Sequence, residues 1–113
     1  MLRIIPEKDW KYLRSIQSEL LSSLCKKIND EATEILASRE MTEHDKYRAL
    51  YRHMLASDEI IAQCFDDWRR STIHQKVIML FHNGLLLDEH VSHLSDDVKN
   101  LLKGVHLKRG LIR

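Results

Sequence analysis

The sequence predicts an all-α domain, and three observations lead to that prediction. Glycine and proline are scarce, because the 113 residues contain three glycines and one proline, well below ordinary usage. A β-sandwich or barrel needs a turn about every 8–12 residues, and the residues for those turns are missing. Apolar residues make up 43% of the chain, and they recur at helical spacing. We expect one domain over residues 1–113, with five or six helices and a long N-terminal amphipathic helix packed against the shorter ones.

The first predicted helix begins after Pro6, whose fixed φ suits a first helical turn. Glu7 and Asp9 follow, where the helix dipole favours negative charge. An apolar residue then recurs every three or four positions, and no glycine or proline interrupts residues 7–40. This pattern predicts one amphipathic helix of about 31 residues. Its apolar positions are Trp10, Leu13, Ile16, Leu20, Leu24, Ile28, Ala32 and Ile35.

Such a helix is too long for the rest of the chain to cover evenly. We expect it to bend, to break near Asn29-Asp30, or to place part of its apolar stripe against another chain. A long coiled coil is not predicted, because a strict heptad counted from Trp10 reaches Gln17.

The second predicted helix starts at Thr42, with Asp45 three positions later in the manner of a capping box. Arg52 and His53 lie at its end, where the helix dipole favours positive charge. Its apolar residues are spaced i, i+3, i+4, i+7 and i+8, which predicts that they form its buried face. These residues are Tyr47, Leu50, Tyr51, Met54 and Leu55.

Ser57 is predicted to cap a third helix. The apolar pattern pauses at Ser71-Thr72, where either a fourth helix begins or the third continues. Asn83-Gly84 predicts a stop, because glycine tolerates the left-handed conformation that ends many helices. The inward positions of this region are predicted to be Ile60, Ile61, Cys64, Phe65, Trp68, Ile73, Val77, Leu80 and Phe81.

Asp88 and Ser95 are two further N-cap candidates. They predict a short helical turn and then a last helix, which ends at Gly104. Residues 105–113 show no periodicity, and we expect a flexible basic tail there. The apolar residues of the turn and the last helix are Val91, Leu94, Val98, Leu101 and Leu102.

The charge balance and the cysteines exclude several classes of protein. Eighteen basic and seventeen acidic side chains give a net charge of +1, so no overall field attracts nucleic acid or a membrane. Cys25 and Cys64 form no C-x-x-C pair, and we expect two buried free thiols. The N-terminus lacks the apolar core of a secretory signal, and the longest apolar run, residues 77–81, is too short to span a bilayer. We expect a cytoplasmic protein without a cofactor.

His90 and His93 are weak candidates for a metal site, because their i, i+3 spacing places two imidazoles on one helical face. Zinc accepts such ligands but needs at least a third from the protein, and no H-E-x-x-H motif is present. His74 and His82 lie eight positions apart, nearly on one helical face, and are the histidines considered as further ligands beside His90. We interpret these side chains as surface histidines and expect no metal.

The sequence contains no catalytic signature that we recognise. A G-x-S-x-G elbow and the glycine-rich phosphate loops are missing. We therefore predict a non-enzymatic protein-interaction domain that forms a homodimer or binds another protein. The candidates for partner contact are Trp10, Tyr12 and Leu13, since aromatic residues are enriched among interface hot spots.

The alternative prediction is weak binding of DNA or RNA through scattered basic residues and the tail. A helix-turn-helix around Gly84 matches poorly, because the positions expected to be apolar fall on His90 and His93. The candidate nucleic-acid contacts are Arg69, Arg70, Lys76, Lys99, Lys103, Lys108 and Arg109.

Overall fold

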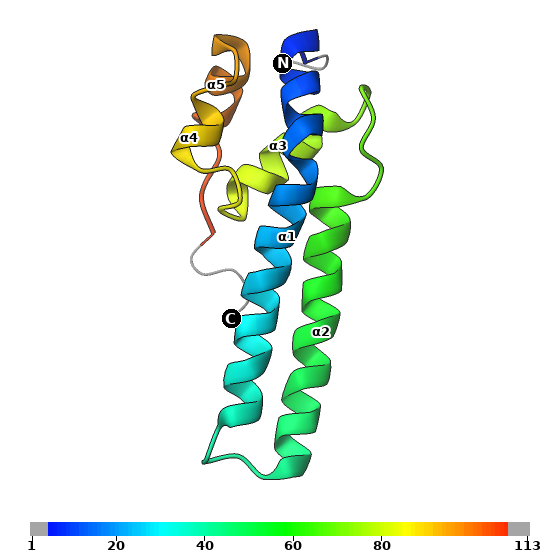
Figure 1. Ribbon diagram of the computed structural model, residues 1–113, viewed down its shortest axis with the longest axis vertical. Helices are drawn as coiled ribbons and strands as arrows, with labels where there is room; N and C mark the ends of the chain where they lie inside the picture. The colour runs from blue at the N-terminus through cyan, green and yellow to red at the C-terminus, as the bar shows by residue number, and fades with distance from the viewer. Residues whose placement is uncertain (1–4, 109–113) are drawn as a thin grey trace.

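The structure, a computed structural model, describes residues 5–108 and has five helices and no strand in that range (Figure 1). The prediction of an all-α fold with a long N-terminal helix is therefore confirmed. The helices are α1 (Glu7–Ala37), α2 (Glu43–Phe65), α3 (Ile73–His82), α4 (Asp88–Val91) and α5 (Asp96–Leu102).

The long helices α1 and α2 form an antiparallel hairpin along the 51 Å length of the molecule (Figure 1). The three short helices lie beside one half of this hairpin, near the start of α1 and the end of α2. The other half, where α1 turns into α2, extends beyond them.

The hydrophobic core lies in the half of the hairpin that the short helices cover. Helices α1, α2, α3 and α5 contribute to it, as do the residue before α1 and the connections on both sides of α4, while α4 adds the partly buried Val91. Burial of apolar surface therefore holds these elements together. Its buried members are Ile5, Leu13, Leu20, Leu24, Ile28, Ile60, Cys64, Ile73, Val77, Leu80, Leu85, Leu86, Leu94, Val98 and Leu102.

Helix α1 has 31 residues and confirms the predicted length. Its apolar stripe supplies fully buried side chains such as Leu13 and Leu24. The helix continues through Asn29-Asp30, so the break considered there is not found. Burial along α1 ends at Ile28.

Helix α2 corrects the prediction of separate helices before and after Ser57, because these segments form one helix of 23 residues. Ser57 is not a cap: it is buried, and its hydroxyl donates to the carbonyl oxygen of His53 at 2.7 Å. That bond satisfies the hydroxyl within the helix. Thr42 is confirmed as the N-cap, since its Oγ1 accepts the N–H of Asp45 at 3.1 Å.

The buried face predicted for the first half of α2 is wrong. Tyr47, Tyr51 and Leu55 are 67%, 59% and 54% exposed. His53 is buried instead, and its ring Nε2 lies 2.9 Å from the carbonyl oxygen of Ile28 on α1, to which Nε2–H donates. A polar side chain can occupy the contact between the two helices because this bond satisfies it.

Helices α2 and α3 are separate elements. The chain leaves α2 at Asp66 and passes through Asp67, whose φ of 60° lies in the left-handed region and stops the helix. Trp68 was predicted to continue the inner face of this helix, but it lies in the connection. Its Nε1–H donates to the carbonyl oxygen of Cys64 at 2.7 Å, which fixes the indole against the end of α2.

Gly84 confirms the predicted stop after α3. Its φ is +75°, and the N–H of Leu85 donates to the carbonyl oxygen of Leu80 at 2.9 Å. A hydrogen bond that closes six residues in this way defines a Schellman motif, which requires a left-handed conformation at the residue before Leu85, here Gly84.

The two caps predicted after α3 differ in outcome. Asp88 is the first residue of α4 rather than its cap, because Leu87 holds the extended conformation before the helix. Ser95 is confirmed as the N-cap of α5, since its Oγ accepts the N–H of Val98 at 3.4 Å.

The chain after α5 returns toward α3. The N–H of Lys108 donates to the carbonyl oxygen of His82 at 2.7 Å, and the His82 Nδ1 lies 2.5 Å from the carbonyl oxygen of His106. Hydrogen bonds therefore hold residues 105–108, the described part of the predicted flexible tail. Residues 109–113 lie outside the described residues.

Candidate functional site

The side of α2 that faces away from α1 carries a row of large apolar side chains, which we call the outer strip. Tyr47, Tyr51, Met54 and Leu55 form it, and each is exposed. His53 is two positions after Tyr51, about 200° around the helix, and faces the core. Within residues 5–108, helix α2 is thus packed on the side of His53, Ser57, Ile60 and Cys64 and exposes large apolar side chains on the opposite side.

A polar residue lies beyond each end of the outer strip. His44 precedes it by one turn and Asp58 follows it by one turn, and both are exposed. A surface hollow of about 350 Å³ lies at the edge of the strip, lined by its two tyrosines and by Arg48 and Arg52.

The strip lies on the half of the hairpin that the short helices leave uncovered (Figure 1). Residues 29–52 are all described, and none of them is buried. Leu36 of α1 is also exposed in this half, at 53%. Two helices alone cannot enclose a core, so this end of the molecule keeps much apolar surface in contact with solvent.

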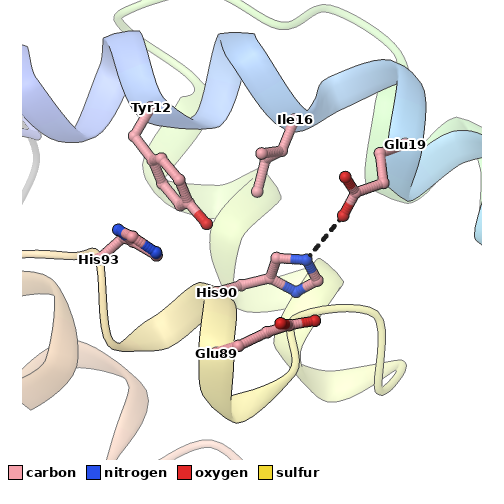
Figure 2. Close-up of a pocket in the computed structure, with 6 residues that line it drawn as sticks. All are labelled: Tyr12, Ile16, Glu19, Glu89, His90 and His93. Carbon is pink, nitrogen blue, oxygen red and sulfur yellow. Dashed lines mark hydrogen bonds and ion pairs between the residues drawn. The ribbon is translucent and has the colours of Figure 1, made fainter.

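A second, polar hollow of about 230 Å³ lies between the first half of α1 and α4 (Figure 2). The ring of His90 is buried and both of its nitrogens are paired. Its Nδ1 accepts the N–H of Leu87 at 3.0 Å, so Nε2 carries the proton and donates to the Glu19 carboxylate at 2.9 Å. The histidine therefore fastens α4 to α1. The hollow is lined by Tyr12, Ile16, Glu19, Glu89, His90 and His93.

Tyr12 lies at the other end of this hollow (Figure 2). Its ring stacks on that of His93, with 4.8 Å between the ring centroids and 26° between the planes. Burial raises the pKa of the Tyr12 hydroxyl above its ordinary value, and the negative charges of Glu19 and Glu89 raise it further. The phenol is held neutral, as a hydrogen-bonding group rather than a base.

The two histidines considered as metal ligands have other roles in the structure. His90 is buried and bound to Glu19, which corrects its interpretation as a surface histidine. His93 is exposed and stacks on Tyr12. Over residues 5–108, no three histidine, cysteine or acidic side chains form a group that could hold a metal ion.

The three candidates for partner contact have separate environments. Leu13 is completely buried in the core, so it is not available to a partner, and that assignment is wrong. Trp10 is half-buried beneath two cations, with the Arg14 and Arg70 guanidinium carbons 5.4 Å and 6.0 Å from the ring centroid. Tyr12 lines the polar hollow.

The basic residues near the start of α3 are engaged within the protein. Arg70 pairs with Glu7 and donates to the carbonyl oxygen of Ile5 at 2.8 Å, which ties the α2–α3 connection to the start of α1. Arg69 forms an exposed ion pair with Asp67; this hydrogen-bonded pairing holds the pKa of the Asp67 carboxyl below its usual range.

Lys76 also binds the chain itself. Its Nζ donates to the carbonyl oxygens of Ala62 and Gln63 at 3.4 Å and 3.1 Å. These carbonyls lie in the last turn of α2, where the helix dipole attracts a cation.

The other basic candidates lie on α5 or after it. Lys99 is half-buried, whereas Lys103 and Lys108 are exposed. Arg109 lies outside the described residues.

The outer strip is the feature that sequence analysis missed, although its residues were singled out. Their spacing correctly indicates one apolar helix face, but periodicity does not say whether such a face packs inward. The sequence contains one signal that the outer strip is exposed. A second, weaker stripe of His53, Ser57, Ile60 and Cys64 runs along the other side of α2, and the structure buries this one.

The remaining features add no chemistry to these sites. Cys25 and Cys64 are both free, Cys25 half-buried and Cys64 buried. None of the helices between residues 5 and 108 is long and apolar enough to cross a membrane.

Comparison with known protein families, with curated proteins and with solved structures finds no match for this chain.

Proposed function

We propose that this protein is a non-enzymatic helical protein-interaction domain whose contact surface is the outer strip of α2. The observation that carries the proposal is the exposure of Tyr47, Tyr51 and Leu55 on a regular helix whose opposite side is packed. These side chains do not serve the core of this chain. Their burial against another protein would remove their apolar surface from water.

The chemistry of the strip suits binding. Tyrosine is enriched at protein interfaces, because a large ring is buried while its hydroxyl stays hydrogen-bonded. Methionine adapts its shape to a partner surface. Arg48 and Arg52 flank the strip and supply the polar rim that surrounds a typical apolar interface centre.

The shape of the molecule supports the same function. The uncovered half of the α1–α2 hairpin has no buried residue from 29 to 52, so a partner would supply the layer that is missing there. A partner helix laid along α2 would complete the usual packing of helix against helix.

The nucleic-acid alternative has less support. Arg70 pairs with Glu7 and donates to a main-chain carbonyl oxygen, and Lys76 donates to two others. Arg69 is paired with Asp67. Phosphate binding would have to replace these contacts. Binding of DNA or RNA that weakens steeply with salt would favour this alternative.

The test compares the wild-type protein with two arginine variants as purified baits. Tyr51→Arg places a charge in the middle of the strip, whereas Ser23→Arg places the same charge on an exposed position of α1. We expect a protein ligand, either this chain or another, to bind the wild type and Ser23→Arg alike. Binding to Tyr51→Arg should be at least about tenfold weaker, because a central aromatic residue is a typical hot spot.

Cross-linking followed by mass spectrometry locates the contact. Cross-links of the bound protein should map to residues 43–59 of the bait. Absence of any bound protein, or equal binding by Tyr51→Arg and Ser23→Arg, contradicts the proposal.

A further inference from the structure

We propose that the outer strip binds the outer strip of a second copy of this chain, with the two α2 helices antiparallel and crossing at Tyr51. This inference rests on the proposed function, since it names the partner of the same surface. The arrangement gives a symmetric dimer in which two α1–α2 hairpins meet through their uncovered halves.

Four exposed residues in and beside the strip are spaced symmetrically about Tyr51. Tyr47 and Leu55 lie four positions before and after it, and His44 and Asp58 lie seven positions before and after it. All five are exposed on the same side of α2. A two-fold axis passing beside Tyr51 therefore places a complementary residue opposite each of them.

The antiparallel arrangement joins unlike groups. Tyr47 of each copy lies opposite Leu55 of the other, so a ring packs on an aliphatic side chain. His44 of each copy lies opposite Asp58 of the other, where an imidazole N–H donates to a carboxylate. Tyr51 meets Tyr51 at the centre, away from solvent.

A parallel arrangement joins like groups instead. It brings Asp58 against Asp58 and His44 against His44, and it leaves both carboxylates without a donor. Like charges placed opposite each other are destabilising. The two polar ends of the strip therefore select the antiparallel orientation and a second copy as the partner.

The surface hollow fits this arrangement. It is lined by Tyr47 and Tyr51 together with Arg48 and Arg52, and in the proposed dimer Leu55 of the second copy projects toward it at the level of Tyr47. Ridges of one helix commonly pack into such depressions of another. The second copy thus fills a hollow that no side chain between residues 5 and 108 occupies.

The size of the contact predicts a weak dimer. Residues 44–58 span about 21 Å of helix, so the contact is smaller than a standard interface of about 800 Å² on each partner. We expect a reversible dimer with a dissociation constant on the order of micromolar. Sedimentation should show the mass rising with concentration, and Tyr51→Arg should weaken the association at least about tenfold.

Disulfide cross-linking tests the orientation, in a background where Cys25→Ser removes the accessible thiol. A disulfide needs Cα atoms within about 7 Å. Tyr51→Cys should cross-link with itself. Tyr47→Cys and Leu55→Cys should each fail to do so, because each would be about 12 Å along the axis from its own copy, but a mixture of the two should form the heterodimer.

The control is Ser23→Cys on α1, which should give no cross-link above background. The introduced cysteines replace exposed side chains, so circular dichroism should remain that of the Cys25→Ser background. Self-cross-linking of Tyr47→Cys and Leu55→Cys as readily as of Tyr51→Cys indicates a parallel or random contact and overturns the inference.

The outcome for the dimer can be separated from that for the proposed function. A wild-type protein that stays monomeric up to about 500 µM, far above the expected constant, overturns the inference. If such a monomer binds another protein through Tyr51, the proposed function survives without the dimer. If neither a second copy nor another protein depends on Tyr51, both are wrong.

Discussion

The carboxylate of Asp9 accepts two hydrogen bonds from Ser95, one from its backbone N–H at 2.9 Å and one from its hydroxyl at 2.5 Å. These residues are 86 positions apart and lie in the first turn of α1 and at the N-cap of α5. Asp9 is completely buried. One carboxylate therefore satisfies both polar groups of the Ser95 cap and joins the start of α1 to the start of α5.

Loss of this contact should destabilise the fold. Asp9→Ala leaves the partly buried Ser95 N–H and hydroxyl without their acceptor, and we expect a loss of about 2–3 kcal/mol in the free energy of unfolding. Urea denaturation measures it. The matched control is Asp30→Ala in the same helix, which removes an exposed ion pair with Lys26 and should cost under about 0.5 kcal/mol. Equal losses in the two variants would contradict a joining role for Asp9.

The two sides of α2 should respond differently to the same kind of truncation. Ile60→Ala removes a buried side chain and leaves a cavity, so we expect a loss of about 2–4 kcal/mol. Leu55→Ala removes an exposed one and should cost less than about 1 kcal/mol. Denaturation at concentrations too low for association measures both. A larger loss for Leu55→Ala would mean that the outer strip belongs to the core of this chain.

These contacts explain why the sequence predicted α1 well and α2 in part. Helix α1 has a single apolar stripe, and the structure buries its residues Leu13, Leu20, Leu24 and Ile28. The largest apolar side chains of α2, among them Tyr47 and Tyr51, are outside, while its packed side includes His53 and Ser57. A polar residue enters the core through a partner such as the Ile28 carbonyl oxygen, and hydropathy along the sequence contains no information about that partner.

The same limit applies to the candidate sites. From its neighbours alone, Asp9 is predicted to be a favourable charge at a helix start. Its hydrogen-bond partner Ser95 is too distant in the sequence to be predicted. His90 and Glu19, which fasten α4 to α1, are 71 positions apart. The boundaries set by local chemistry, such as the Thr42 cap, were predicted because the residues that determine them are neighbours.

Gly84 should be more sensitive to substitution than Gly104. Both have open space where a Cβ would be added, but only Gly84 has a positive φ, +75°. Gly84→Ala should therefore cost about 1 kcal/mol of stability from backbone strain alone. Gly104→Ala should be neutral or slightly stabilising, because alanine restricts the unfolded chain. Thermal denaturation of the pair tests this, and a loss at Gly104 as large as that at Gly84 would contradict it.

Cys64 should make the stability of the fold fall in alkaline solution. Burial raises the pKa of its thiol from 9.0 to about 11, against smaller opposing effects of a hydrogen bond from Asn83 and the charges of Lys76 and Lys108. Between these two values the unfolded chain releases the thiol proton while the folded chain retains it. The unfolded state then binds fewer protons, so the free energy of unfolding decreases as the pH rises.

The contribution of this one thiol is isolated by a variant that cannot ionise. Cys64→Val keeps an apolar side chain of similar size, and every other titrating group is common to both proteins. Urea denaturation from pH 8 to pH 11 should show the wild type losing roughly 2 kcal/mol more than Cys64→Val. At pH 8 iodoacetamide should modify Cys25 much faster than Cys64, because the thiolate is the reactive form. Parallel stability curves for the two proteins, together with rapid modification of Cys64, would mean that the thiol is not held protonated in the core.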